Sequence, residues 1–443
     1  MEERLGEIIK MKKMKLAVLS WPLVFGFMNP NPVIAEVNQC DGFLKPLCAE
    51  IDKVVQPSEV LGASIAITQE DGKMSYATFN KTPEGEAITP DMKFEVGSIT
   101  KTFTAARILQ LVEKGKLKLD TPIADILPSN EVFFSSKIPG NLTIRNLLSM
   151  NAGLYDYVAS YRVMSKDLSA FWPLRNMTSG GYHPNDPKIG EHCYGSTNSL
   201  LLGLVIDKLN GGNGLTKEPL ITSYRKGLLE PAGLKNTFMG GYEDEYPISS
   251  CTNVNYFDTV ENVPPKRCAN PDFYLYTGNG KASNDSKTAY LSFAGPAGGM
   301  ISTAEDIANW FDWLFTKGPG PKMVESTILM GERDNDDEGF ITWLKCGQEP
   351  WPYADPKLKK LENGYTIEIA TTQHEDKTVK TYGFVGGSLT FNSHVVYLPE
   401  YKTSIAVLLN NFNASTDSLP LSTTIQVYAI ADIIIDHIIN SSK

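Results

Sequence analysis

The chain has 443 residues, of which 42% are hydrophobic, so it is long enough to bury a core in one large domain or two intermingled ones. Its 51 acidic residues outnumber 41 basic ones, which gives a formal net charge of −10 and no basic stripe. We therefore expect no nucleic-acid partner. The five histidines are scattered without ligand spacing, and no phosphate-cradling glycine loop precedes a helix, so no metal and no cofactor are expected.

The first 35 residues are typical of a secretory signal peptide. Four lysines precede an apolar run from Leu16 to Met28, and Ala35 offers a small residue at a cleavage site. The run is too short for a bilayer span. Three glutamates at the very start are unusual in such a segment, which leaves Met11 and Met14 as alternative start sites. We expect an exported protein, periplasmic or secreted, without a stable membrane span.

Further along the chain, the patterns predict strands towards both ends and helices between them. Residues 36–54 are expected to form a tether, and 61–79 a hairpin that turns at Glu70-Asp71-Gly72. The stretches 155–190, 242–295 and 331–380 are polar and irregular, and we interpret them as surface segments or insertions. The other expected elements are helices over 98–115, 142–148 (capped by Thr143), 197–209, 304–315 and about 423–439, and strands over 393–398 and 404–409.

This order favours an α+β fold. One antiparallel sheet would be formed by the N-terminal and C-terminal strands with flanking helices, and a mostly helical region would be inserted between them. The expected division is a signal peptide at 1–35, a tether at 36–54 and one domain at 55–443, with its helical insertion at about 117–380.

The six cysteines fit an oxidising compartment. Their proximity in the sequence suggests the disulfides Cys40–Cys48 and Cys251–Cys268, although other pairings remain open. Cys193 and Cys346 are expected to be buried, inert thiols.

Ser98 and Lys101 are the strongest candidates for chemistry. An extended stretch ends at Gly97 and a helical pattern follows, so Ser98 falls at a helix start, where unpaired N–H groups and the helix dipole favour negative charge. Lys101 lies on the same face, and a desolvated lysine can activate a serine nucleophile. A second Ser-x-x-Lys, Ser223 to Lys226, has no glycine before it and no clean helix after it, which favours a structural role.

Two more stretches carry candidate site residues. In Tyr194-Gly195-Ser196, a tyrosine stands at a helix start and can act as a general base near a lysine; the alternative is an ordinary half-buried tyrosine, one of 19. In Phe384-Val385-Gly386-Gly387, glycines in a strand let a substrate lie against the backbone and expose an N–H to an oxyanion. The alternative there is a β-bulge or bend.

Taken together, these stretches resemble the class C β-lactamase and penicillin-binding-protein-like family of serine hydrolases. Ser98 to Lys101 matches the family's Ser-x-x-Lys, and Tyr194 to Ser196 matches its Tyr-x-Asn, with serine in place of asparagine. Phe384 to Gly386 falls on its Lys-Thr-Gly or His-x-Gly motif. A register three residues upstream, Thr381 to Gly383, is an alternative that spoils the downstream spacing. The resemblance covers about residues 55–437.

The resemblance implies a β-lactamase/transpeptidase-like fold and an acyl-enzyme mechanism without a cofactor. Ser98 would be the nucleophile, Lys101 and Tyr194 would share its proton, and the N–H groups of Ser98 and Gly387 would form the oxyanion hole. The residues implied to lie beside the substrate are Ser196, Phe384 and Gly386.

Two departures from the family motifs shape the expected substrate. Phe384 removes the cation or imidazole that would meet a substrate carboxylate, and Ser196 is too short to replace the asparagine fully. We therefore expect an exported, esterase-like serine hydrolase that acts on neutral acyl groups of a small-molecule or peptide-like substrate. A β-lactamase or D-Ala-D-Ala carboxypeptidase is the alternative, and a non-catalytic binding member of the same fold is the second alternative. The oligomeric state stays unknown.

Overall fold

The computed structural model describes residues 38–56, 60–81, 87–127, 138–154, 156–157, 171–174, 189–243, 287–333, 340–342, 357–388, 391–411 and 421–442. Residues 36–443 belong to one compact unit. The predicted signal peptide, the predicted pair Cys251–Cys268 and Cys346 lie outside the described residues, as do most of the stretches 155–190 and 242–295.

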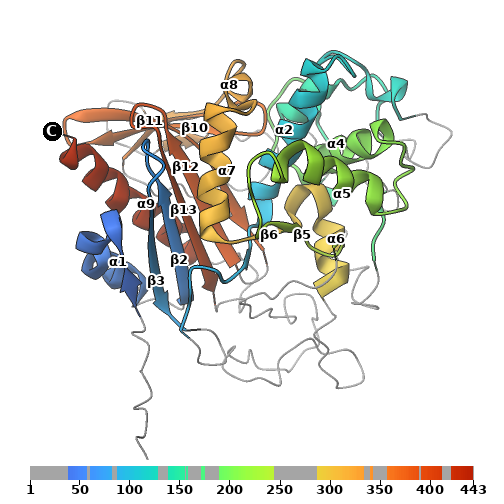
Figure 1. Cartoon of the computed structure of the whole chain (residues 1–443). Coiled ribbons are helices and arrows are strands. Elements are labelled where there is room, and N and C mark those ends of the chain that lie inside the picture. Colours follow the sequence, from blue (N-terminus) through green and yellow to red (C-terminus); the bar gives the residue numbers. More distant parts are fainter. Residues whose placement is uncertain are drawn as a thin grey trace, which may run out of the picture. The chain divides into compact units, whose positions relative to one another are not determined.

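A large antiparallel sheet forms the centre of this unit, and both ends of the chain contribute to it, as predicted (Figure 1). In the described residues its order is β1-β3-β2-β13-β12-β11-β10-β9-β7-β8, and the neighbouring strands are antiparallel throughout. The strands are β1 (Gln39–Cys40), β2 (Val60–Thr68), β3 (Met74–Asn80), β7 (Ile328–Arg333), β8 (Phe340–Thr342), β9 (Leu358–Asn363), β10 (Glu368–His374), β11 (Lys377–Gly387), β12 (Phe391–Leu398) and β13 (Thr403–Asn411).

Helices cover both faces of the sheet, which explains why its central strands are apolar on both sides. In β2, Ile65 and Ile67 pack in one core while Ala66 packs in the other, because successive side chains of a strand point to opposite faces. Helices α1 (Cys48–Val55) and α9 (Leu421–Ser441) lie on the first face, and α7 (Ala304–Thr316) lies on the second (Figure 1).

The remaining helices form a layer beside the sheet, on the same side as α7 (Figure 1). Within it α2, α4 and α6 pack against one another. A small sheet, β4-β6-β5, links the start of α2 to the end of α6. These elements are β4 (Phe94–Glu95), β5 (Phe238–Met239), β6 (Met300–Ser302), α2 (Thr100–Glu113), α3 (Ile144–Leu148), α4 (Ser196–Leu209), α5 (Glu218–Tyr224), α6 (Lys287–Gly298) and α8 (Gly320–Met323), with the short turns η1 (Gly42–Leu47), η2 (Gly97–Ile99), η3 (Ile123–Asp125) and the π-helical turn η6 (Arg225–Leu229).

Local signals set the ends of two predicted helices. The Thr143 hydroxyl accepts a hydrogen bond from Asn146 N, and the Asn146 side chain accepts one from Thr143 N, so α3 begins with a reciprocal cap. After α2, Gly115 has φ 64° and Lys116 N donates to Leu111 O at 2.9 Å. This is the Schellman arrangement that a glycine permits at a helix end.

The expectation that 36–54 form a tether was wrong. From residue 39 on, this stretch forms β1, which pairs with β3, followed by η1 and α1. Its apolar side chains follow each other at spacings of three and four residues and cover the sheet face beside α9, since that face would otherwise stay exposed. The buried residues are Leu44, Leu47, Ile51 and Val55.

The interpretation of 331–380 as an irregular insertion was also wrong in its second half. Residues 358–380 form β9, β10 and the start of β11, which extend the sheet beyond the strand that carries Gly387. In β11 the buried Val379 and Thr381 alternate with the exposed Thr378 and Lys380. Because polar residues occur at both buried and exposed positions, the alternation of burial is not visible as a hydrophobic pattern in the sequence. The range 117–380 therefore contains sheet strands as well as helices.

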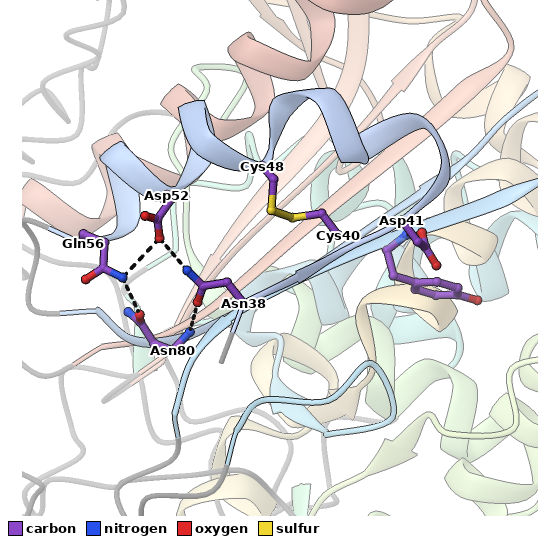
Figure 2. The surroundings of a disulfide bond; sticks show 8 residues. Asn38, Cys40, Asp41, Cys48, Asp52, Gln56 and Asn80 are labelled. Atoms are coloured by element: carbon purple, nitrogen blue, oxygen red, sulfur yellow. Dashed lines mark hydrogen bonds between the residues drawn. A yellow bond between two sulfur atoms is a disulfide. The ribbon is translucent and has the colours of Figure 1, made fainter. Parts of the chain in front are cut away.

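The predicted disulfide Cys40–Cys48 is present and joins β1 to the first turn of α1 (Figure 2). Beside it, Asn38, which precedes β1, connects α1 to β3: its Nδ2 donates to Asp52 Oδ1 at 2.8 Å, and its Oδ1 accepts from Asn80 N at 3.1 Å (Figure 2). The disulfide and this side chain together hold α1 against the outer part of the sheet.

Helix α9 packs as an amphipathic helix, as predicted. Val427, Ile430 and Ile434 are fully buried in the core beneath the sheet, while Asp436 accepts a hydrogen bond from Lys357 at 2.7 Å. Among the helices that the structure describes, α9 included, none has the length and apolar character needed to cross a membrane.

Candidate active site

Ser98 lies in the turn η2, which leads directly into α2, so its predicted place at a helix start is confirmed. The residue before it, Gly97, has φ 49°, a conformation that favours glycine. A Cβ at this position would lie 2.5 Å from Gly387 O. Glycine is therefore required both by the turn and by the close approach of β11.

Lys101 points to Ser98 from the first turn of α2. Its side chain is buried, with 1% of the residue exposed, and its Nζ lies 2.8 Å from Ser98 Oγ and 2.6 Å from Ala297 O. Burial lowers the pKa of Lys101 to about 7, while the negative charge of Asp156 acts in the opposite direction. Near neutral pH a substantial fraction of the lysine is thus an uncharged amine, which can accept the proton of Ser98.

The end of α6 supplies the acceptor for Lys101. Ala297 is the last residue but one of α6, where helix carbonyls have no partner in their own helix. The helix is broken just before, at Gly295 (φ 41°) and Pro296. The Thr104 hydroxyl donates to Pro296 O at 2.7 Å, and a Cβ on Gly203 would lie 2.2 Å from the Pro296 ring. Helices α2 and α4 therefore both hold this carbonyl segment in place.

Tyr194 reaches Ser98 from the residues before α4. Its hydroxyl lies 2.6 Å from Ser98 Oγ, and Lys101 Nζ is 5.1 Å from the centre of its ring. Burial raises the pKa of Tyr194; the hydrogen bond with Ser98 lowers it, and the charges of Asp156 and Glu368 raise it further. The phenol is therefore protonated at neutral pH. A protonated phenol argues against Tyr194 as the general base that the sequence suggested, and the uncharged amine of Lys101 is the better proton acceptor.

The glycines of β11 settle which register of the third motif approaches Ser98. A Cβ on Gly386 would lie 2.1 Å from Val96 O and 3.1 Å from Ser98 N. A Cβ on Gly383 would instead meet the backbone of β12. In addition, the Ser393 hydroxyl of β12 donates to Val96 O at 2.9 Å. The predicted register 384–386, and not 381–383, therefore lies beside Ser98.

Strand register also sets the direction of the Gly387 N–H. Ser388 N donates to Phe391 O, so this pair is hydrogen-bonded, and the preceding pair, Gly387 and Asn392, is of the alternate kind. The Gly387 N–H consequently points away from β12. The pairing of β11 with β10 has already ended at Gly383. The pairing of β11 with β10 and β12 in the described residues therefore does not use this N–H group.

The two residues that depart from the family motifs lie in different surroundings. Phe384 is 1% exposed and belongs to the core on the α7 face, so its ring is a packing group rather than a surface beside the substrate. Ser196 is the buried first residue of α4, and its N–H donates to Asp156 Oδ2 at 3.2 Å.

Two participants of this site were missed in the sequence. Asp156 follows Gly153-Leu154, but no motif spacing relates it to Ser98. Ala297-Gly298-Gly299 resembles a family segment, but Ala297 contributes a carbonyl oxygen, which every residue type has, so its residue type gives no signal of this contact. Only the packing of α6 against α2 brings it to Lys101.

Outside this site, the other candidate reactive side chains have contacts that fit a structural role. The hydroxyl of Ser223, in the second Ser-x-x-Lys, accepts from Arg107 Nε at 2.8 Å and from Asn210 Nδ2 at 3.1 Å, whereas Lys226 is exposed. Cys193 is buried, as expected. Within the part of the chain that the structure describes, no group of three or more His, Cys, Asp or Glu side chains could hold a metal ion.

Comparison with known proteins gives one family match. The family described as Beta-lactamase matches residues 50–428 of this chain. Among individual proteins, the teichoic acid D-alanine hydrolase of Staphylococcus aureus is 24% identical over 351 residues, which covers 75% of this chain and 72% of that protein.

Two solved structures are similar to this chain in fold. The D-amino acid amidase of Ochrobactrum anthropi SV3, complexed with L-phenylalanine amide, has a TM-score of 0.62 and 19% identity and covers 90% of this chain and 100% of its own. A penicillin-binding protein from Bacillus halodurans has a TM-score of 0.57 and 18% identity, with 86% and 98% covered. At these identities the likeness shows the fold, including the large antiparallel sheet with flanking helices.

Proposed function

Because the chain belongs to the Beta-lactamase family, whose members are serine hydrolases, we propose that it hydrolyses its substrate through an acyl-enzyme on Ser98. The observation that carries the proposal is the convergence of Lys101 Nζ, at 2.8 Å, and the Tyr194 hydroxyl, at 2.6 Å, on Ser98 Oγ. A nucleophile within reach of a base, which is itself held by a third group, is the general arrangement for covalent catalysis. Here the third group is the carbonyl of Ala297.

In the acylation step, Ser98 Oγ forms a bond to the substrate carbonyl carbon while its proton moves to the neutral amine of Lys101. Negative charge then develops on the carbonyl oxygen. The N–H groups of Ser98 and Gly387 stabilise this charge, with a contribution of about 3 kcal/mol for each donor. As the bond to the leaving group breaks, the Tyr194 hydroxyl donates a proton to the departing atom, and the proton on Lys101 restores Tyr194.

In the deacylation step, water attacks the acyl carbon and gives its proton to the same pair of side chains. The bond between Ser98 Oγ and the acyl carbon breaks, and Ser98 recovers its proton from Lys101. No further reactant is needed, since hydrolysis adds only water to the bond that is cleaved.

The substrate class that we propose is an acyl ester or amide without a carboxylate beside the reacting carbonyl, neutral esters included. The position at which the family motif has lysine or histidine is Phe384, whose ring is buried in the core. This position therefore offers no cation or imidazole to a substrate carboxylate, which would lose hydration on binding without gaining that partner. The D-amino acid amidase in the comparison is named for amino acid amides, which have no free carboxylate.

The alternative is a β-lactamase or D-Ala-D-Ala carboxypeptidase, whose substrates carry that carboxylate. The second alternative, a non-catalytic binding protein, is disfavoured because a decayed site has no reason to keep a buried lysine whose pKa is lowered towards 7. We also propose export of the chain, which the Cys40–Cys48 disulfide supports because disulfides persist in oxidising compartments.

A serine-reactive covalent probe, mapped by peptide mass spectrometry, tests the nucleophile. The label is expected on Ser98, and Ser98→Ala should abolish turnover. Lys101→Met and Tyr194→Phe should each lower kcat by at least about 100-fold, the size of a lost proton transfer. Lys226→Met is the matched control, because Lys226 is the exposed lysine of the second Ser-x-x-Lys and should leave kcat unchanged.

Labelling of Ser223, or turnover by Ser98→Ala, would contradict the assignment. The same preparation should hydrolyse a nitrophenyl ester with a higher kcat/KM than a cephalosporin or a D-Ala-D-Ala peptide. A clear preference for either carboxylate-bearing substrate would contradict the proposed substrate class and leave the nucleophile assignment intact.

A further inference from the structure

Two neighbouring carbonyl groups at the end of α6 accept hydrogen bonds from α2. Lys101 Nζ lies 2.6 Å from Ala297 O, and the Thr104 hydroxyl donates to Pro296 O at 2.7 Å. Lys101 and Thr104 are three residues apart, so their side chains leave α2 on one face. The residue that holds the proposed base is therefore itself held, one position earlier in the chain, by a second side chain of the same helix.

Helix α6 does not satisfy the Pro296 carbonyl by itself. In a continuing α-helix Pro296 O would accept from Met300 N, four residues on, but Met300 N donates to Thr100 Oγ1 at 3.0 Å instead. A buried carbonyl without a donor costs free energy, so Pro296 O needs a donor from outside its helix. The fully buried Thr104 is that donor.

Tyr224 directs the Thr104 hydroxyl towards α6. Its own hydroxyl lies 2.6 Å from Thr104 Oγ1, and the tyrosine is fully buried. A hydroxyl group has one hydrogen, so Thr104 can donate to Pro296 O only if Tyr224 is the donor to Thr104. The hydrogen bonds therefore run from Tyr224 to Thr104 and from Thr104 to Pro296 O.

The Ala297 carbonyl affects both the orientation and the charge of the Lys101 amino group. In the uncharged amine, an N–H donated to Ala297 O fixes the rotation of the group, so its lone pair has a set direction relative to Ser98 Oγ, 2.8 Å away. The carbonyl also favours the ammonium form, because hydrogen bonds from charged donors are stronger. Displacement of this carbonyl would therefore change the rate of proton transfer and the pH at which Lys101 loses its proton.

We propose that Thr104 and Tyr224 are positioning residues for the base Lys101, on which they act through the carbonyl end of α6. This inference rests on the proposed acyl-enzyme function of Ser98. It also gives a role to the second Ser-x-x-Lys segment, in which Tyr224, and not the serine before it, is connected to the site.

The test follows hydrolysis of p-nitrophenyl acetate, a neutral ester, between about pH 5 and pH 9. In Thr104→Val, which keeps the shape of the side chain, kcat on the plateau above the acidic limb should fall at least about 10-fold, because the amine loses its orientation. The acidic limb of the kcat/KM profile should lie at least about 0.5 pH unit lower, because the acceptor that favours the ammonium form is displaced. Thr104→Ser, which keeps a hydroxyl, should restore kcat to within about 3-fold of wild type and return the limb to its wild-type position.

The position of the acidic limb is the readout that a merely structural role would not move. Tyr194, whose ring centre is 5.1 Å from Lys101 Nζ, and Asp156, whose negative charge acts on Lys101, are present in every variant. A difference in the limb between Thr104→Val and wild type therefore reports the changed hydrogen bonding of Lys101.

Ser223→Ala is the matched control for lost stability. Ser223 is buried next to Tyr224, but its hydroxyl accepts from Arg107 and Asn210, so its removal breaks hydrogen bonds of the same helical layer and leaves those to α6 in place. This variant should keep kcat within about 3-fold of wild type and the acidic limb unmoved, even where denaturant titration shows a loss of stability as large as that of Thr104→Val. Tyr224→Phe should change both quantities in the direction of Thr104→Val, but by less, since Thr104 keeps its hydroxyl.

An acidic limb that stays in place in Thr104→Val would overturn the inference, whatever the change in kcat. Equal changes in Ser223→Ala and Thr104→Val would overturn it as well, because they would indicate a general loosening of the helices. If Thr104→Val does not fold, Tyr224→Phe decides the matter, and wild-type kcat with an unmoved limb in that variant would contradict the positioning role.

The outcomes also separate this inference from the function on which it rests. Turnover by Ser98→Ala would overturn the acyl-enzyme itself. Loss of turnover in Ser98→Ala together with an unmoved acidic limb in Thr104→Val would overturn only the positioning role. If the ester is not hydrolysed, the rate at which the serine probe labels Ser98 replaces kcat, and the dependence of that rate on pH is judged by the same outcomes.

Discussion

At the scale of the residue, Lys101 shows how chemistry and stability oppose each other. A lysine that is 1% exposed has lost its hydration, and its hydrogen bonds to Ser98 and Ala297 replace only part of it. The result is a pKa lowered to about 7. The same burial that destabilises the charged form provides the base of the proposed reaction at neutral pH, so the cost in folding free energy is tied to that reaction.

This coupling predicts two pH effects. Wild-type activity should increase with pH, whereas the stability of a Lys101 variant should decrease with pH relative to that of wild type. The kcat/KM of wild type on a neutral ester should rise with pH through about 7, because only the neutral amine accepts the Ser98 proton. Lys101→Met should have a kcat at least about 100-fold lower than wild type. Its free energy of unfolding, relative to wild type, should decrease as pH rises from about 7 to about 10, measured by denaturant titration.

The sign follows from proton linkage. In that pH range the unfolded chain keeps Lys101 protonated while the folded chain does not, so wild-type stability rises with pH by up to about 1.4 kcal/mol per unit. Below the folded-state pKa of about 7, Lys101 is protonated in both the folded and the unfolded chain, so wild-type stability no longer changes with pH through this group. Lys226→Met, at an exposed site, should show no such pH-dependent difference from wild type.

At the scale of the element, the site depends on the close approach of a turn and a strand. Ser98 lies in the turn η2, and Gly386 and Gly387 lie at the end of β11. Each of these two elements has a glycine where the backbone of the other element approaches, because a Cβ there would clash. Both proposed oxyanion donors are backbone N–H groups, one from each element. Their relative position is therefore a property of this packing and not of any side chain.

Gly97→Ala tests that dependence against a matched control, Gly115→Ala. Both glycines have positive φ, but a Cβ on Gly97 would lie 2.5 Å from Gly387 O, whereas a Cβ on Gly115 meets nothing within 4 Å. Gly115→Ala should cost only about 1–2 kcal/mol of stability and leave kcat unchanged. Gly97→Ala should in addition lower kcat by at least about 100-fold, the size of one lost oxyanion donor.

Stability is measured by denaturant titration, and kcat with a neutral ester. A Gly97→Ala variant that is destabilised as much as Gly115→Ala but retains wild-type kcat would show that the distance between η2 and β11 does not limit catalysis.

At the scale of the whole molecule, the sheet separates the site from helix α1. Ser98 and α2 belong to the side that α7 covers, whereas α1 packs with α9 against the other face (Figure 1). The disulfide Cys40–Cys48 closes a short loop within this second layer. Its contribution should therefore be to stability alone.

Cys40→Ser with Cys48→Ser should lower the free energy of unfolding by about 2–3 kcal/mol, as expected for a closed loop of this length, and leave kcat/KM unchanged. In protein isolated from its native host, this disulfide should be oxidised and the chain should begin near Glu36 by N-terminal sequencing. A reduced disulfide and an uncleaved chain would contradict the proposed export, and a loss of kcat/KM would contradict the separation of the two layers.

Several features could be predicted because each depends on a local pattern. The start of α2 at Ser98, the cap at Thr143 and the helix end at Gly115 follow from residues within one turn of each other. The hairpin of β2 and β3 follows from two runs of strand-forming residues joined by the turn Glu70-Asp71-Gly72. The fold class followed from the order of such elements, and the motif resemblance pointed to Ser98, Lys101 and Tyr194, which the structure brings together.

Other features were decided only by tertiary structure, because their causes are not local. The α1 segment packs against α9, which is far away in the sequence, and β9 and β10 extend the edge of the sheet at β11 although they lack a clear apolar pattern of their own. The lowered pKa of Lys101 arises from burial beneath α6, and its acceptor is a carbonyl oxygen. Asp156 is held at the start of α4 by a hydrogen bond from Ser196 N, a contact that no sequence spacing indicates. Sequence alone determined which groups could react, and only packing determined how they are charged, since desolvation and the sum of nearby charges depend on every element around the site.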